Sequence, residues 1–88
     1  MPINIYEAKG YKEVAYLAEN EWGLPMQLSI LERWLIKVQN ELPQGDYVAD
    51  IGFVTSPEAA GGGGSFSSSS MRIASQLGIT IFFSEYPS

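Results

Sequence analysis

The first residues of the chain alternate apolar and polar side chains. Ile3 and Ile5 are separated by Asn4, and Tyr6 and Glu7 continue a segment rich in β-forming residues. A period of two places successive side chains on opposite faces of a strand. We therefore expect a strand over residues 3–7, with Gly10 marking its end.

The next segment has its apolar residues at helical spacing. They are Tyr11, Val14, Ala15, Ala18 and Trp22. This pattern places them on one face and predicts a first helix over residues 11–22, with Tyr16 on the opposite face. Asn20 and Gly23 are typical of a helix end.

A second helix is predicted over residues 24–42 by the longest apolar stripe in the chain. The stripe consists of Leu24, Leu28, Leu31, Leu35, Val38 and Leu42, at spacings of four, three, four, three and four. Pro25 suits the first turn, and Pro43 followed by Gly45 ends the helix. Trp34 widens the stripe. Ile36 and Ile30 lie off it, and these side chains either widen the buried face or contact something else.

Residues 47–55 read as a second strand with two largely apolar faces. Tyr47, Ala49, Ile51 and Phe53 share one face. Such a pattern is typical of a central strand that is covered on both sides. Asp50 is the exception, because it interrupts the other apolar face with a charge.

The stretch 57–68 is rich in glycine and serine, and we interpret it as a flexible loop. Its serines can cap a third helix near residues 67–77, and Gly78 has the character of a left-handed helix stop. The apolar segment 79–84 completes the pattern as a strand.

These elements predict a single domain, residues 1–88, of the α/β (or α+β) class. Their order is β-α-α-β-α-β, with helices packed on a three-stranded sheet. A strand–helix–strand unit favours a right-handed crossover, which makes the last two strands parallel. The loop is long enough to leave an antiparallel last strand open, and the position of the first strand is not determined.

The amino-acid composition excludes several kinds of catalytic and metal-binding site, because the residues that they need are absent. The 88 residues contain no Cys and no His, which removes disulfides, thiolate nucleophiles, imidazole bases and the usual zinc ligands. No catalytic or cofactor motif occurs, so we expect a non-enzymatic protein without a cofactor or metal. The chain shows no signal peptide and no membrane-spanning apolar run, which favours the cytoplasm of a bacterial or virus-infected host cell.

Charge narrows the class of partner. Ten acidic and five basic residues give a net charge of −5. This balance argues against direct binding to nucleic acid or to an anionic membrane, since both reward clustered Lys and Arg. It fits solubility, and it also fits docking to a basic protein surface.

The glycine-rich loop before a helix is one candidate site. Backbone N–H groups at such a helix start can bind an anion. The candidate residues are Gly61, Gly62, Gly63, Gly64, Ser67, Ser68 and Arg72. The loop lacks the lysine of a P-loop and the spacing of a dinucleotide fingerprint, so a flexible surface loop and a segment that orders on a protein partner are the competing interpretations.

The carboxylates Glu7, Asp46, Asp50 and Glu85 form a second candidate, because they lie in or beside strands. If they converged at one end of the sheet, they could hold Mg²⁺ or Ca²⁺ or exchange protons. Solvated charges at strand ends are the simpler interpretation, and no ligand spacing supports a metal.

Large apolar residues form the third candidate, because they are numerous for so small a core. The candidate interface residues are Tyr16, Trp34, Ile36, Phe82 and Tyr86. Tyr and Trp are common at interface hot spots, although an aromatic-rich core would have the same composition. The leading hypothesis is a protein-interaction module, an acidic inhibitor or adaptor that binds a basic protein or a second copy of itself. The alternative is a small-ligand, nucleotide or anion-binding domain that uses the glycine-rich loop and the helix after it.

Overall fold

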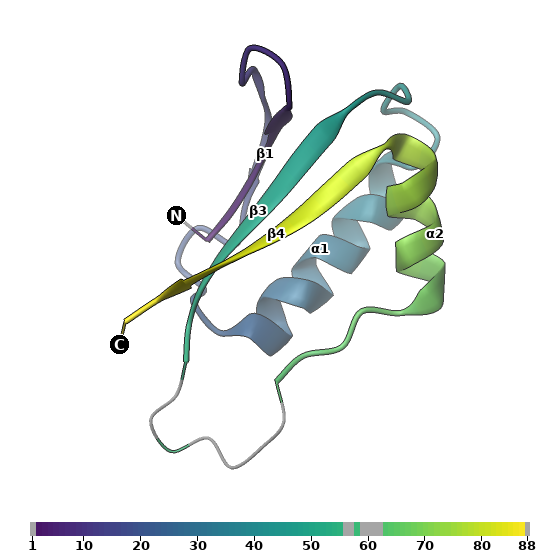
Figure 1. Cartoon of the computed structure of the whole chain (residues 1–88). Helices are drawn as coiled ribbons and strands as arrows, with labels where there is room; N and C mark the ends of the chain where they lie inside the picture. The colour runs from purple at the N-terminus through teal and green to yellow at the C-terminus, as the bar shows by residue number, and fades with distance from the viewer. Residues whose placement is uncertain (1, 56–57, 59–62, 88) are drawn as a thin grey trace.

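The computed structural model describes residues 2–55, 58 and 63–87. These residues form an α+β fold with one four-stranded mixed sheet and two helices (Figure 1). The elements follow the order β-β-α-β-α-β, and the strands lie in the sheet in the order β2-β1-β3-β4. The prediction of three strands in the order β-α-α-β-α-β is therefore wrong at one element, the first predicted helix.

Residues 11–22 contain a strand rather than a helix. β1 (Ile3–Glu7) and β2 (Glu13–Leu17) form an antiparallel hairpin. Gly10 and Tyr11 have φ angles of 80° and 57° in its turn, and Ala18 has a φ of 54° just after β2. A right-handed helix cannot pass through such positions.

A bulge explains why the periodicity was misleading. The pairing register shifts between Ile5 and Tyr6, whose partners are Ala15 and Glu13, so Val14 is the extra residue. Val14 and Ala15 consequently both pack against the core. Two adjacent inward residues hide the strand period of two and imitate a helical face.

The centre of the sheet is β3 (Tyr47–Val54), which pairs antiparallel with β1 and parallel with β4 (Ile79–Tyr86). The parallel pairing of the last two strands is confirmed, and β4 extends two residues beyond the predicted segment. Its register with β3 is regular over the whole length of both strands. β1 lies beside β3, which leaves β2 and β4 as the edges.

The helix α1 (Leu24–Val38) confirms the apolar stripe. Leu28, Leu31 and Leu35 are buried against the sheet. The helix ends at Val38, four residues earlier than predicted, and the chain turns there, with the Val38 carbonyl accepting hydrogen bonds from the N–H groups of both Glu41 and Leu42.

The helix α2 (Ser68–Leu77) has both predicted caps. The Ser67 side chain accepts a hydrogen bond from the Ser70 N–H, as a serine N-cap does. Gly78 follows with a φ of 82°, and its N–H donates to the carbonyls of Ala74 and Ser75. This left-handed stop sends the chain directly into β4.

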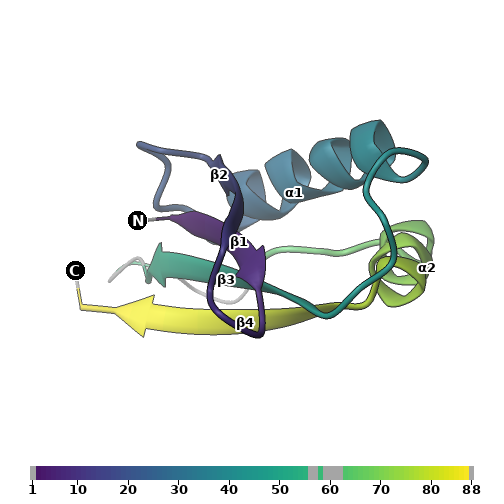
Figure 2. The same ribbon diagram turned by 90° about the horizontal axis from the view of Figure 1, so that it is seen from above.

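Both helices pack on one face of the sheet (Figure 2). The core between them and the sheet includes Ile3, Ile5, Ala49 and Ile51. The expectation that β3 would be covered on both sides is therefore wrong for one side of the sheet. We call this second side, on which the described residues place no helix, the open face. Within the described residues, neither helix is long and apolar enough to cross a membrane.

Candidate functional site

One row of side chains crosses the open face through all four strands. The pairing register places Tyr16 beside Asn4, Asn4 beside Asp50, and Asp50 beside Phe82. Because side chains alternate along each strand, these four residues point away from the helix-covered core residues Ile5, Ala49 and Ile81. The row brings two aromatic rings, an amide and a carboxylate together on one surface.

Three of the five predicted interface residues lie on this face. Tyr16 and Phe82 are 42% and 51% exposed. Tyr86, on the same face of β4 as Phe82, packs its ring edge-on against Trp22, with 5.7 Å between the ring centroids. Trp22 lies in the loop before α1, and its carbonyl accepts a hydrogen bond from the Val54 N–H. The open face thus carries aromatic side chains from its outer edge at β2 to the end of β4.

The other two predicted interface residues lie on α1, in the helical layer. Trp34 is half-buried and packs against the core, so it serves the fold. Ile36 is 58% exposed on the outside of the helix. The structure therefore does not bring these two together with Tyr16, Phe82 and Tyr86.

Asp50 has a defined geometry in the middle of the open face. The Ser84 hydroxyl of β4 donates a hydrogen bond of 2.7 Å to its Oδ1. Asp50 is half-buried and lines a recess of about 290 Å³ together with Asn4, Glu13 and two tyrosines, Tyr6 and Tyr11. The rings of Tyr6 and Tyr11 contact each other at a centroid distance of 5.8 Å.

Sequence reasoning missed Asn4, Tyr11 and Glu13 as parts of this recess. The apolar spacing predicts a helix at Tyr11 and Glu13, and only the hairpin brings them to the same recess as Asp50. The strand period in this segment is hidden because Val14, the extra residue of the bulge, places Glu13 and Ala15 on opposite faces of the sheet. Asp50 was singled out for interrupting an apolar face, and it does lie at the centre of the open face.

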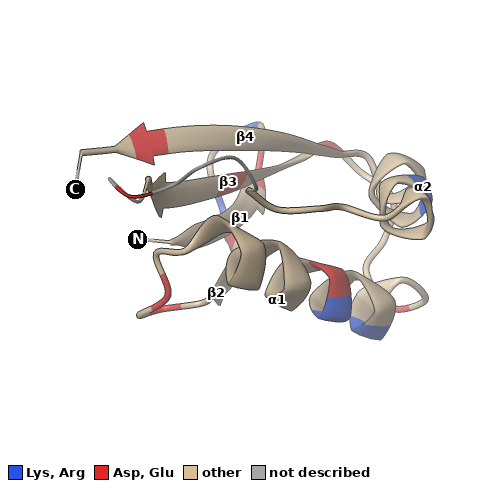
Figure 3. Ribbon diagram, turned by 90° about the horizontal axis from the view of Figure 1, so that it is seen from below, with Lys and Arg blue, Asp and Glu red and all other residues tan. Residues whose placement is uncertain are grey.

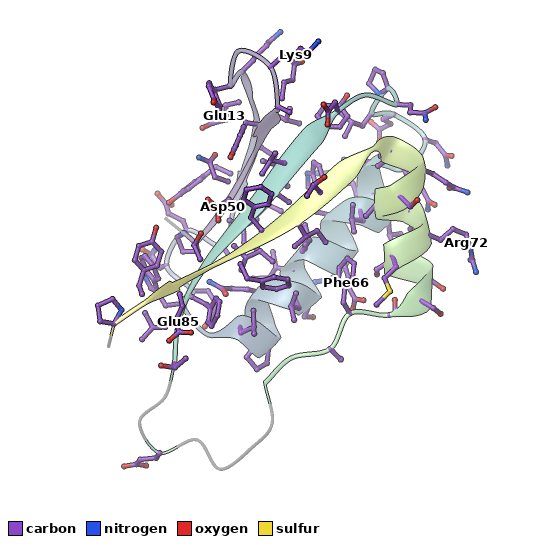
Figure 4. The ribbon with its side chains drawn as sticks, in the orientation of Figure 1. Lys9, Glu13, Asp50, Phe66, Arg72 and Glu85 are labelled. Carbon is purple, nitrogen blue, oxygen red and sulfur yellow. The ribbon has the colours of Figure 1, made fainter. Side chains whose placement is uncertain are left out.

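The basic residues lie elsewhere (Figure 3). Arg33 and Lys37 are on α1 and Arg72 is on α2, while Lys9 and Lys12 are in the hairpin turn. In Figure 4, Lys9 extends from the end of the hairpin away from Asp50. None of the strand residues of the open face is a cation.

The start of α2, the candidate anion site, is bonded to a carboxylate of α1. Glu32 Oε2 accepts hydrogen bonds from the Ser67 backbone N–H at 2.6 Å and from the Ser70 hydroxyl at 2.7 Å. The hydrogen bond from the Ser67 backbone, with that from Ser70, holds the pKa of Glu32 below its ordinary value. The protein thus supplies its own anion at this helix N-terminus.

The other described residues of the predicted loop site do not converge on a common anion-binding site. Ser68 is exposed, and Arg72 points outward from α2 (Figure 4). Gly63 and Gly64 precede the helix. Gly61 and Gly62 lie outside the described residues, as do residues 57, 59 and 60 of the predicted flexible loop 57–68.

The four predicted carboxylates do not meet at one end of the sheet. Glu7 and Asp46 lie at the hairpin end, where the Ala8 N–H donates to the Asp46 carbonyl. Glu85 pairs with Phe53 near the opposite end, and Asp50 lies between. The described part of the chain contains no group of three or more acidic, His or Cys residues placed to hold a metal ion.

A second exposed apolar region follows the edge strand β4. Phe83 is 58% exposed on the helix-covered side of β4, where Phe66 and Met71 line the same groove of about 450 Å³. An uncovered edge strand presents unpaired backbone groups and is a natural place for another strand to pair.

Comparison of the chain with protein-family models, with curated proteins and with solved structures finds no match.

Proposed function

We propose that this chain is a non-enzymatic protein-interaction module, an acidic inhibitor or adaptor that docks a basic protein surface through the open face of its sheet. The observation that carries the proposal is the row Tyr16–Asn4–Asp50–Phe82, which places exposed aromatic rings on both sides of a carboxylate. Aromatic residues provide most of the binding energy in many interfaces, and charges set orientation and partner choice.

The charge distribution supports a basic partner. The open face contains Asp50 and Glu13, and the strands contribute no Lys or Arg to it. With a net charge of −5, the chain as a whole attracts a cationic surface at long range. The helical layer, which carries Arg33, Lys37 and Arg72, is less suited to such a partner.

The absence of His and Cys from the sequence supports a role in binding rather than in catalysis. With no imidazole or thiol, acid–base work would depend on carboxylates that stand apart on the sheet. A protein that acts by contact alone needs none of these groups. We place its action in the cytoplasm, consistent with a chain free of cysteine.

The alternative, a small-ligand or nucleotide/anion-binding domain, would use the segment 61–70 and the start of α2. The hydrogen bonds from Ser67 and Ser70 to Glu32 make this alternative less favourable. An incoming phosphate would have to displace a carboxylate of like charge from the same donors. The geometry therefore supports the interaction module better.

The test compares substitutions at two residues that are similarly exposed, one on the open face of the sheet and one in the helical layer. Phe82→Arg places a positive charge on the open face, and Ile36→Arg places the same charge on the outside of α1. Tagged full-length chains are used to capture partners from a lysate of the source cell, after circular dichroism has shown that both variants are folded. Light scattering of the purified chain measures its oligomeric state.

We expect one protein partner that is bound by the wild type and by Ile36→Arg, is lost with Phe82→Arg, and is released by salt. Loss with Ile36→Arg alone would move the interface to the helical layer. A partner retained by both variants would contradict docking by the open face. A stable dimer with no other partner would instead point to pairing of β4 edges, and a co-purifying small molecule would favour the alternative.

A further inference from the structure

We infer that the recess around Asp50 receives an arginine side chain from the protein partner. This inference rests on the proposed function and names the group that the open face would recognise. The recess is formed by two carboxylates, Asp50 and Glu13, and by the rings of Tyr6 and Tyr11. A guanidinium group matches both features, because it pairs with carboxylates and stacks on aromatic rings.

Both carboxylates are free of a cation in the described structure. Neither Asp50 nor Glu13 forms an ion pair with any described residue, and Asp50 has one hydrogen bond, from Ser84 to its Oδ1. That bond fixes the side chain and leaves Oδ2 for a donor from outside. Glu13 is exposed on β2, opposite Tyr6 in the pairing register, so the two acids approach the recess from different strands.

Asn4 provides an independent sign that the recess is incomplete. Its Oδ1 is buried and has no hydrogen-bond partner among the described residues. A buried acceptor without a donor is unfavourable, and a donor supplied by a partner would satisfy it. Asn4 lies between Tyr16 and Asp50 in the row, so a guanidinium held by Asp50 would bring its N–H groups to this amide.

Arginine fits the recess better than lysine. The planar guanidinium carries five N–H donors, enough to serve two carboxylates and an amide oxygen at once. Its flat face can also lie against the ring of Tyr11, which is 76% exposed. An ammonium group has three donors and no flat face.

The inference is tested with a defined probe that does not require the natural partner. The probe is the blocked tripeptide acetyl-Gly-Arg-Gly-amide, titrated in the millimolar range into the full-length ¹⁵N-labelled chain. Three matched tripeptides carry citrulline, lysine or norleucine in place of arginine. Citrulline keeps the shape and most donors of arginine but has no charge. Chemical-shift changes identify which residues respond.

We expect the arginine peptide to shift the Asn4 side-chain amide and the backbone signals of Tyr6, Glu13 and Asp50. Citrulline and norleucine should produce no saturable change, and lysine should bind more weakly than arginine. Asp50→Asn preserves the shape of the side chain and an acceptor for Ser84, and it should weaken arginine binding by about tenfold, the usual effect of losing a charged hydrogen bond. Glu41→Gln removes the same charge from an exposed position in the turn after α1 and should leave binding unchanged.

Equal responses to arginine and citrulline, or shifts spread over Glu41 and Asp46 as well, would overturn the inference. So would Asp50→Asn binding as tightly as the wild type. These outcomes are distinguishable from failure of the proposed function. If Phe82→Arg abolishes partner capture while the arginine peptide does not bind, docking by the open face stands and the arginine recess does not. If the peptide binds but no protein is captured through this face, the recess stands and the proposed function fails.

Discussion

The Glu32 carboxylate of α1 accepts a hydrogen bond of 2.6 Å from the backbone N–H of Ser67, at the start of α2. The two residues are 35 positions apart in the sequence, and Ser70 adds a second donor to the same oxygen. Helix N-termini attract negative charge through their free N–H groups and the helix dipole. Glu32 therefore joins the two helices and orients α2 on the sheet.

This contact predicts a loss of stability in acid. The folded-state pKa of Glu32 lies below its ordinary value of 4.5, so the unfolded chain binds the proton more readily. The stabilising contribution is complete above the unfolded pKa and is lost as the pH falls through the folded pKa. Glu32→Gln should remove this acid dependence and lower the unfolding free energy at pH 7 by about 1 kcal/mol or less, since the carboxylate is open to solvent.

Urea denaturation at a series of pH values measures the effect. Glu41→Gln, an exposed substitution outside this contact, is the control and should keep the wild-type acid profile. An acid profile unchanged by Glu32→Gln would show that the contact with Ser67 does not contribute.

The stop after α2 predicts a large difference between two glycines. Gly78 has a φ of 82°, and a Cβ there would fall on the carbonyl oxygen of Gly45. Gly10 has a φ of 80° with open space around it. Gly10→Ala should cost about 1–2 kcal/mol, the ordinary cost of a left-handed conformation, and Gly78→Ala clearly more, because the backbone must also move. Thermal unfolding of the two variants compares them directly, and equal losses would exclude the steric contribution.

The buried amide of Gln27 predicts a stability defect from a polar-to-apolar change. Its Nε2 donates hydrogen bonds of 2.7 Å to the carbonyls of Glu21 and Gly52, which attaches the loop before α1 to the central strand. Gln27→Met keeps the length of the side chain but leaves both carbonyls without this donor. We expect a loss of about 2–4 kcal/mol in unfolding free energy.

The matched control for Gln27 is Gln39→Met at the exposed end of α1. The Gln39 side chain makes a hydrogen bond of 3.2 Å within its own helix, to the Ile36 carbonyl. This variant should change the unfolding free energy by less than about 0.5 kcal/mol, as exposed substitutions usually do. A Gln27→Met variant as stable as this control would contradict the role assigned to the buried amide.

The ring pair Trp22–Tyr86 predicts measurable coupling at the end of the open face. A double-mutant cycle with Trp22→Ala and Tyr86→Ala should give an interaction energy of about 0.5–1 kcal/mol, the lower part of the range for edge-on aromatic pairs because both rings are partly exposed. A second cycle of Trp22→Ala with Phe83→Ala, whose side chain lies on the other face of β4, should give a value near zero. Similar values in both cycles would show that the ring contact is not the cause.

The elements that were predicted correctly are those with local signals. The stripe of α1 carries its own helical period, and α2 has a serine cap at one end and Gly78 at the other. Apolar runs identified β3 and β4. Each signal lies within one segment, because helix caps and side-chain periodicity are properties of neighbouring residues. The segment 13–17 failed because its bulge is defined by pairing with β1, a partner outside the segment.

The residues of the candidate site also fall into two groups, those that the sequence could indicate and those that only strand pairing reveals. Tyr16, Phe82, Tyr86 and the unusual Asp50 could be selected from the sequence as large or misplaced side chains. Their common position on the open face depends on the register of three strand pairs. Asn4 and Glu13 could not be selected, because nothing near them in the chain distinguishes an interface residue from an ordinary polar strand residue.

The sequence by itself determined the helices α1 and α2, the central strand, the acidic balance and the lack of imidazole and thiol chemistry. Tertiary structure alone decided that residues 13–17 form an edge strand, that both helices cover one face, and that the row Tyr16–Asn4–Asp50–Phe82 lies across the other. The physical reason is the range of the interactions. Caps and helical periods act within a few residues, whereas strand pairing and burial join residues far apart in the chain, where only the folded structure brings them into contact.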